Sequence, residues 1–289
     1  MTIGCFGPKG TFTDYAYQQA APLRDCSHLP VHLFHTFPTL FEALASDTVS
    51  GIFSPIENVI EGPVNPVLDA LVDYEDLAIT ASYTMPIHQS LISCNPTLQI
   101  TDITDIISMP HAIAQCHGFI HRHFPHATVH HSSSTAAALT RLTDLQLPIA
   151  TTALIGHKGL CDYHDCVVIH DAIHDHNHNA TEFGFIEKIT APPSSPIDMD
   201  VRAMVAFSTP HDQPGSLVGA LTLFHNYNMN MTKILSRPNK NRPGAYIFYV
   251  EFSMAGHTIA DRDGLCRELK AASLFFRFLG HYGRYHLHD

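Results

Sequence analysis

Residues 211–250 read HDQPGSLVGALTLFHNYNMNMTKILSRPNKNRPGAYIFYV, and this stretch decides how the last third of the chain folds. A Pro-Gly turn is followed by apolar residues at helical spacing, namely Leu217, Val218, Leu221 and Phe224. The pattern then predicts a strand that ends in Ser236-Arg237-Pro238 and a second strand over Tyr246–Phe252. A helix followed by two strands is half of a split βαβ unit.

The flanking segments complete a six-element module. Strands are predicted over Val201–Phe207 and Leu274–Tyr282, and helices over Ser216–Tyr227 and Arg262–Ala271, which gives the order βαββαβ of a ferredoxin-like domain. Immediately upstream, Thr190–Pro196 reads TAPPSSP and has no apolar periodicity, so it is predicted to be a linker. The chain therefore divides into a first domain over residues 1–190 and a second over 197–289.

Strands and helices alternate regularly through the first domain. The predicted strands are Ile3–Phe6, Val31–Phe34, Gly51–Ser54, Leu77–Met85, Ser90–Cys94, Thr128–His130, Ile149–Ala150, Val167–Ile169 and Glu182–Ile189. The predicted helices are Asp14–Ala21, Pro38–Ala45, Pro63–Leu71, Pro110–His123, Ser133–Leu142 and Thr152–Gly159. Such alternation predicts an α/β domain whose parallel-type sheets are covered by helices.

Composition is that of a globular protein, with 289 residues and 45% hydrophobic side chains. The N-terminus has neither the basic nor the long apolar region of a signal peptide, and no run of about eighteen apolar residues occurs. The seven cysteines are scattered and never spaced CxxC. We therefore expect a cytoplasmic protein with reduced thiols.

Charge divides unevenly along the chain. Residues 1–190 carry 6 Lys and Arg against 19 Asp and Glu, whereas residues 191–289 carry 10 against 8. So acidic a first domain would repel phosphate backbones, and nucleic-acid binding is not expected. The run HDAIHDHNHN at His170–Asn179 could bind Zn²⁺ or Ni²⁺, but its spacing matches no closed structural site and the chain holds 23 histidines, so no metal site is expected.

Five short motifs of the first domain concentrate polar groups near predicted strand and helix ends. They are GPKGTF at Gly7–Phe12, SPIENVIEGPV at Ser54–Val64, SMPHAIAQC at Ser108–Cys116, SSSTAAAL at Ser132–Leu139 and NATEFGFI at Asn179–Ile186. Backbone amides with Thr11, or with Ser134 and Thr135, could hold an anion at a helix N-terminus. Tight turns and helix caps explain the same hydroxyls, including that of Ser108.

In this order the motifs resemble those of prephenate dehydratases. The resemblance implies a two-lobed, periplasmic-binding-protein-like catalytic domain that converts prephenate to phenylpyruvate for phenylalanine biosynthesis and needs no cofactor. It implies Thr181 as the catalytic hydroxyl and Glu57 as a proton source. The implied substrate-binding residues are Thr11, Asn58, Ser108, Gln115, Ser134, Thr135, Phe183 and Lys158.

The second domain resembles the ACT regulatory domain of the same family, in which two motifs bind phenylalanine as an allosteric effector. The matching residues are Gly215, Ser216, Leu217 and Val218, followed by Leu235, Ser236, Arg237 and Pro238. ACT pockets form between two chains, so the resemblance implies a homodimer or homotetramer.

The sequence departs from the family pattern at three positions. Glu182 stands where the family has Arg, Leu235 where the effector motif has Glu, and Met109 where His is usual. Near a dianionic substrate, replacing Arg by Glu reverses the local charge by two units. Either Glu182 turns away from the cleft while Lys9 or Lys158 supplies the missing charge, or the enzyme is impaired.

Two alternatives therefore stay open beside a regulated prephenate dehydratase. A non-aromatising prephenate decarboxylase would keep the cleft and change its acid groups, so that Glu182 could protonate the ring. A catalytically impaired amino-acid sensor would keep only effector binding. Under the leading hypothesis, Glu182→Arg is expected to raise activity or leave it unchanged.

Overall fold

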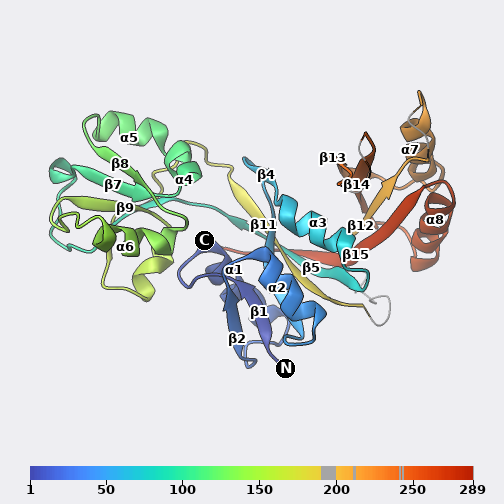
Figure 1. Cartoon of the computed structure of the whole chain (residues 1–289), viewed down its shortest axis with the longest axis horizontal. Coiled ribbons are helices and arrows are strands. Elements are labelled where there is room, and N and C mark those ends of the chain that lie inside the picture. Colours follow the sequence, from blue (N-terminus) through green and yellow to red (C-terminus); the bar gives the residue numbers. More distant parts are fainter. Residues whose placement is uncertain (190–199, 211–212, 241, 243, 289) are drawn as a thin grey trace.

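The computed structural model describes residues 1–189, 200–210, 213–240, 242 and 244–288, and Figure 1 shows them as two sheets with flanking helices. The strands are β1 (Ile3–Phe6), β2 (Val31–Phe34), β3 (Gly51–Asn58), β4 (Gly62–Pro63), β5 (Leu77–Pro86), β6 (Ser90–Ser93), β7 (Asp105–Ser108), β8 (Thr128–His131), β9 (Thr152–Gly156), β10 (Val167–His170), β11 (Ala180–Lys188), β12 (Val201–Ser208), β13 (Met231–Pro238), β14 (Tyr246–Ser253) and β15 (Phe275–His286). The helices are α1 (Phe12–Leu23), α2 (Phe37–Ala45), α3 (Asn65–Asp73), α4 (Pro110–Gln115), α5 (His117–His123), α6 (Thr135–Asp144), α7 (Ser216–Asn226) and α8 (Ile259–Ala271), with 3₁₀ turns η1 (Ile100–Asp102) and η2 (Lys158–Asp162).

The larger sheet runs through most of the molecule. Its order is β13-β14-β12-β15-β5-β11-β3-β1-β2, with β4 paired to β3. The segment from β12 to β15 has the predicted order βαββαβ. The strand β15 is longer than predicted, and its second half pairs in parallel with β5. The predicted linker Thr190–Pro196 lies outside the described residues, so the domain boundary stays a prediction.

The smaller sheet forms a separate lobe, at the left of Figure 1. Its order is β10-β6-β9-β7-β8, and the chain enters it after β5 and leaves it before β11. Pairing is parallel between β7 and its neighbours β8 and β9, but antiparallel where β6 meets β9 and β10. The two lobes of mixed α/β structure agree with the predicted fold class.

The predicted helix over Thr152–Gly159 is wrong, because residues 152–156 form β9. Every residue of β9 is buried in the middle of the smaller sheet, and a short apolar run of that kind has no periodicity that separates helix from strand. The strand β7 was not predicted, and the strand predicted at Ile149–Ala150 is a turn. The single helix expected over Pro110–His123 is broken into α4 and α5 at Cys116.

One apolar core crosses the predicted domain boundary. Its first-domain members include Leu40, Ile52 and Leu68, and its second-domain members include Tyr249 and Leu279. Helix α3 thus packs on one face of the larger sheet, and side chains of the second-domain strands lie on the same face. The position of these strands is therefore fixed by shared burial as well as by backbone pairing.

Candidate active site between the two lobes

The candidate site includes a side-chain hydrogen bond between two strands of the larger sheet, β3 and β11. The side chain of Asn58, at the end of β3, donates from Nδ2 to Thr181 Oγ1 at 2.9 Å, and Thr181 is 8% exposed on β11. The same amide group lies within hydrogen-bond distance of Asn179 Oδ1 and the Ala180 carbonyl. Asn58 Oδ1 accepts from the backbone N–H groups of Ile60 and Glu61. Asn58 is therefore occupied by protein partners and orients Thr181.

Buried amides carry this network into the smaller lobe. Gln115, at the end of α4, accepts through Oε1 from Asn179 Nδ2 at 3.1 Å and from Gln89 Nε2 at 3.2 Å. Its own Nε2 lies 3.5 Å from Glu61 Oε1 on the loop after β3. The structure thus brings together Thr181, Asn58 and Gln115, as the motifs predicted. Asn179 and Gln89 were not predicted as site residues, although Asn179 begins the NATEFGFI motif.

The lobes meet a second time at the start of α1. Phe12 and Tyr15 pack against the ring of His157, with ring centroids 4.8 and 4.3 Å apart. Gly10 has φ +76°, and a Cβ there would lie 2.9 Å from Leu160 Cδ1, so the loop needs glycine where it approaches η2. Lys9 lies over the Tyr163 ring at 5.6 Å, and Lys158 is the first residue of η2.

Two of the hydroxyls predicted to hold an anion, those of Thr11 and Ser134, have protein partners. Thr11 caps α1, accepting from Asp14 N and donating to the Pro8 carbonyl. Ser134 caps α6 by accepting from Ala137 N at 2.9 Å. Thr135 is the first residue of α6, and its side chain is outside the described part of the chain. For Thr11 and Ser134 the observed contacts are those of helix caps, so anion binding there stays a prediction.

Two other predicted contacts lie in the core. Ser108 is fully buried at the end of β7 and donates to the Ile155 carbonyl at 2.6 Å. Phe183 is 1% exposed and stacks on Phe53, with ring centroids 5.6 Å apart. Phe183 lies two residues after Thr181 on β11, and the two side chains point to the same face of the larger sheet. For Ser108 and Phe183 the observed contacts are with protein groups, so their substrate contacts stay predictions.

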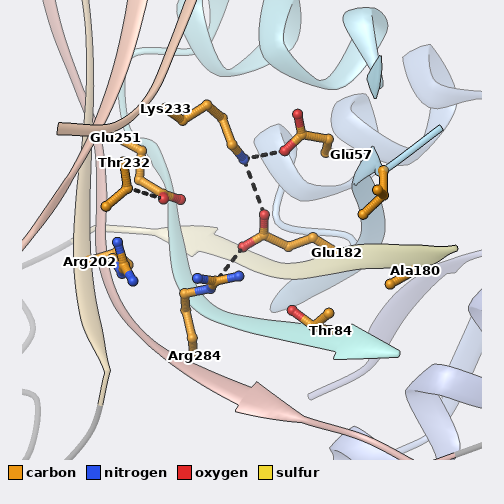
Figure 2. A pocket seen from close by; sticks show the side chains of 10 residues that line it. Glu57, Thr84, Ala180, Glu182, Arg202, Thr232, Lys233, Glu251 and Arg284 are labelled. Carbon is orange, nitrogen blue, oxygen red and sulfur yellow. Dashed lines mark hydrogen bonds and ion pairs between the residues drawn. The ribbon is translucent and has the colours of Figure 1, made fainter. Parts of the chain in front are cut away.

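Glu57 faces away from Thr181. The register pairs Thr181 with Asn58 and Glu182 with Glu57, and neighbouring residues of a strand point to opposite faces. Glu57 and Glu182 line a cavity of about 330 Å³ together with residues from the second-domain strands (Figure 2). This placement does not support Glu57 as a proton source for a substrate held at Thr181. The expectation that Glu182 turns away from the cleft agrees with the structure.

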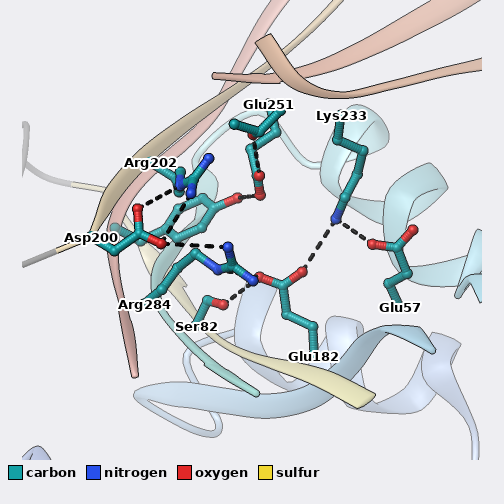
Figure 3. Close-up of polar contacts among 10 residues, drawn as sticks. Glu57, Ser82, Glu182, Asp200, Arg202, Lys233, Glu251 and Arg284 are labelled. Atoms are coloured by element: carbon teal, nitrogen blue, oxygen red, sulfur yellow. Dashed lines mark hydrogen bonds and ion pairs between the residues drawn. The ribbon is translucent and has the colours of Figure 1, made fainter. Parts of the chain in front are cut away.

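Cations of the second domain surround Glu182 (Figure 3). Its carboxylate lies 3.2 Å from Lys233 Nζ and 3.6 Å from Arg284 Nε, and it accepts from the Ser82 hydroxyl. Burial alone would raise the pKa of Glu182, but Lys233, Ser82 and Arg284 outweigh it and hold that pKa below its ordinary value. Burial likewise opposes the charge of Lys233, yet the neighbouring acids raise its pKa. Both groups are charged, and the cations that contact Glu182 are Lys233 and Arg284 of the second domain.

The predicted effector motifs lie on α7 and β13. Gly215 precedes α7 with φ +89°, a left-handed conformation that favours glycine, and Val218 on α7 is 66% exposed. On β13, Arg237 forms two hydrogen bonds with the Asp69 carboxylate of α3, at 3.1 and 3.0 Å. Leu235 packs against the shared core. Arg237 and Leu235 therefore point toward the first domain.

Other classes of site are not evident in the described residues. No group of three or more His, Cys, Asp or Glu in this part of the chain could hold a metal ion. The seven cysteines are free, and Cys94 and Cys166 lie with their Sγ atoms 3.1 Å apart. No helix in the described ranges combines the length and hydrophobicity needed to span a bilayer.

Known proteins share this arrangement over nearly the whole chain. The family model "Prephenate dehydratase" matches residues 3–190. The Bacillus subtilis prephenate dehydratase is 31% identical over 293 residues, covering 99% of this chain and all of the relative. A structure of the Arthrobacter aurescens prephenate dehydratase in complex with L-Phe matches with a TM-score of 0.85 and 28% identity, covering 98% of this chain and 90% of that chain. The Staphylococcus aureus prephenate dehydratase matches with a TM-score of 0.80 and 27% identity, covering 98% and 100%.

Proposed function

Because the chain belongs to the prephenate dehydratase family, we propose that it converts prephenate to phenylpyruvate, with loss of CO₂ and water, as a step of phenylalanine biosynthesis. The observation that carries the proposal is the hydrogen bond from Asn58 to Thr181, continued through Asn179 to Gln115 of the other lobe. It joins groups from both lobes at the place where a substrate between them would be held.

Prephenate becomes aromatic when the C–C bond to its ring carboxylate breaks to release CO₂ and that electron pair expels the 4-hydroxyl as hydroxide, which takes a proton from solvent to become water. The gain of aromaticity drives the reaction, so the protein has mainly to orient the substrate and assist the departing hydroxide. Thr181 suits the second task. Its oxygen accepts from Asn58, so its own O–H is free to point away from Asn58 and to donate to the leaving oxygen. Help of this kind to a leaving group contributes typically about 10²–10⁴-fold.

The substrate carries two carboxylates and needs positive partners. Glu182 supplies none, and its neighbours Lys233 and Arg284 lie on the face of β11 opposite Thr181. Lys9 and Lys158 are placed at the second contact between the lobes, beside the N-terminus of α1. In the proposal these two lysines and the backbone N–H groups of Thr11 and Phe12 at the start of α1 receive the carboxylates, since Gly7 and Gly10 already donate to Phe34 and Asp14. Glu57 has no part in the chemistry.

Product identification tests the proposal directly. Purified protein is incubated with prephenate near neutral pH, and the products are separated and identified by mass and ultraviolet spectrum. Phenylpyruvate is the expected product. A dihydro-hydroxyphenylpyruvate would instead identify a non-aromatising decarboxylase, and unchanged prephenate with tight phenylalanine binding would identify an amino-acid sensor. Either of the last two results contradicts the proposal.

Regulation by phenylalanine forms the second part of the proposal. The motifs at Gly215–Val218 and Leu235–Pro238 support it, because Gly215 opens α7 in a conformation that lets a ligand approach the backbone closely. The edge strand β13 also leaves Met231 and Ile234 exposed, which suits pairing with a second copy in a dimer or tetramer. Phenylalanine should inhibit phenylpyruvate formation, and light scattering with and without phenylalanine should give a mass of two or four chains.

A further inference from the structure

Lys233 is shared between two carboxylates of the first domain. It lies on β13, is 19% exposed, and contacts Glu57 of β3 and, at 3.2 Å, Glu182 of β11 (Figure 3). The cation comes from the strand that also carries the effector motif Leu235–Pro238.

Each of the two carboxylates is adjacent in sequence to one residue of the Asn58–Thr181 pair. Glu57 immediately precedes Asn58, and Glu182 immediately follows Thr181. In the ladder between β3 and β11, Glu57 lies opposite Glu182, and Asn58 lies opposite Thr181. Because neighbouring side chains of a strand share one peptide unit, movement of a carboxylate on one face also moves the hydroxyl or amide on the other.

The backbone is irregular at this place. The register between β11 and β3 shifts between Glu182 and Phe183, so the ladder is locally disrupted one residue after Thr181. A strand at a bulge depends more on its side-chain contacts for its position than a strand in a regular ladder does. Lys233 provides such a contact from β13, a second-domain strand that pairs with neither β11 nor β3.

Without Lys233 the two acids would oppose each other directly. Like charges at paired positions of neighbouring strands are destabilising, and more so where the side chains are largely removed from water. Glu182 has a side chain only 10% exposed, and its remaining cation, Arg284, lies at 3.6 Å. Repulsion would then separate β3 from β11 at the residues that hold the Asn58–Thr181 hydrogen bond.

We propose that Lys233 is a positioning residue for the reaction: from the regulatory strand it binds Glu57 and Glu182 together and so keeps Asn58 and Thr181 in catalytic register. The proposal rests on the proposed dehydratase activity. Lys233 touches neither substrate nor reacting atoms, and it acts through the shared backbone of β3 and β11. A misplacement of about 1 Å at a reacting group can cost about 10²-fold in rate.

Several charged and titratable groups face this ammonium. They are Glu57 on β3, Glu182 on β11, Glu251 on β14, Arg202 on β12, and Arg284 and Tyr282 on β15. Glu251 already accepts from Thr232 and from the Tyr282 hydroxyl. In the absence of Lys233, Glu57 and Glu182 are therefore the acids that lose their bound cation. Burial raises the pKa of Glu182 and Lys233 lowers it, so without Lys233 the Glu182 carboxylate protonates more readily; its protonation removes the repulsion and makes the defect dependent on pH.

The test compares four variants with the wild-type protein by their kcat and KM for phenylpyruvate formation. Lys233→Met is expected to lower kcat about 10–100-fold at pH 7.5 while KM changes less than about threefold, since the substrate contacts remain. Lys233→Arg should recover kcat to within about threefold. The matched control is Lys240→Met, which also removes a second-domain lysine paired with a first-domain acid, Asp69, but at a position two residues beyond the end of β13. Its kcat should stay within about twofold.

The fourth variant, Lys233→Met with Glu182→Gln, separates positioning from general loss of structure. Removing one of the opposed charges should restore at least about a third of kcat, and the defect of Lys233→Met alone should shrink as pH falls from 7.5 to 5.5. If Lys233→Met does not fold, as judged by circular dichroism, the kcat of the double variant still tests the positioning role of Lys233. The proposal is overturned if Lys233→Met keeps more than half of kcat, if its loss is the same at both pH values, or if the double variant is as slow as the single one.

The wild-type protein, assayed in parallel, distinguishes failure of the positioning role of Lys233 from failure of the proposed dehydratase activity. Wild-type turnover with an unaffected Lys233→Met variant overturns the positioning role alone. A wild-type protein that forms no phenylpyruvate overturns the proposed function, and with it the role of Lys233 in that reaction.

Discussion

Asn58 Nδ2 lies 2.9 Å from Thr181 Oγ1 across the antiparallel pair of β3 and β11. The contact fixes the threonine rotamer from one side and leaves its hydroxyl proton for another acceptor. It also joins the residues that lead directly into the smaller lobe, through Asn179 and Gln115. The arrangement makes Thr181 the group whose removal should affect chemistry most and folding least.

Thr181→Val should lower kcat by about 10²–10⁴-fold, because it removes the hydroxyl and keeps the shape of the side chain. The Asn58 amide retains Asn179 and Ala180 as acceptors, so the free energy of unfolding should fall by no more than about 2 kcal/mol. Phenylpyruvate formation and urea denaturation measure the two effects. Thr181→Ser is the control and should keep activity within about tenfold of the wild type. A valine variant as active as the serine variant would rule out the hydroxyl.

Glu182→Arg is now expected to be harmful, in contrast to the expectation from the sequence. The new guanidinium would lie against Lys233 and Arg284 and would leave both without their shared acid. Breaking a buried ion pair in this way costs about 3–5 kcal/mol of stability. Guanidinium chloride unfolding measures the loss. Adding Lys233→Glu restores an opposite pair and should recover most of the stability, and the absence of such recovery would show that the ion pair is not the cause.

Asp69→Asn should loosen the contact between α3 and β13. The Asp69 carboxylate accepts two hydrogen bonds from Arg237, and hydrogen bonds to charged groups contribute about 1.5–3 kcal/mol. We expect a loss of that size in unfolding free energy. Lys240, whose side chain is 70% exposed, binds the same carboxylate, and Lys240→Met should cost less than about 1 kcal/mol. Equal losses from the two variants would contradict a special role for Arg237.

The free energy of unfolding should decrease on acidification because of His281. Burial, together with the neighbouring Arg262, lowers the pKa of His281 from 6.5 to about 4, and Arg262 donates to its Nδ1 at 2.7 Å. The unfolded state binds the proton first, so the stabilisation is complete above pH 6.5 and is lost as the pH falls toward 4, by up to about 3 kcal/mol. Urea unfolding from pH 7 to 4 measures the slope. His281→Gln should flatten it, whereas replacement of the exposed His126 should not.

Much of the fold follows from sequence periodicity. The order βαββαβ after residue 200 was predicted, because α7 and β13 have clear apolar spacing and β14 is a plain apolar strand. The nature of β9 could not be predicted, since five buried residues in a row are compatible with either a strand or a helix segment. The extension of β15 along β5 depends on a contact between segments that are 201 or more residues apart, as in the pair Gly280 and Ile79, which no local pattern reveals.

The sequence predicted which residues gather near the candidate site, but not on which face of the larger sheet each side chain lies. Thr181, Asn58 and Gln115 were expected together and lie together. Glu57 was expected beside Asn58 in the cleft, although the two-residue period of a strand already separates adjacent side chains. One feature of the sequence indicated that Glu182 would find cations in the second domain, namely the excess of acids before residue 191 and of cations after it. Lys233, Arg237 and Arg284 supply that charge across the predicted boundary.

The parallel pairing of β15 with β5 bears on how the protein is synthesised and how it could evolve. Translation completes β15 long after β5 has left the ribosome, so until then one edge of β5 has unsatisfied backbone groups that can pair with another nascent chain. Formation of so distant a pairing is slow by its topology. The segment from β12 to β15 is therefore not an independent unit for recombination between proteins, because any exchange would also replace the strand that pairs with β5 in the larger sheet.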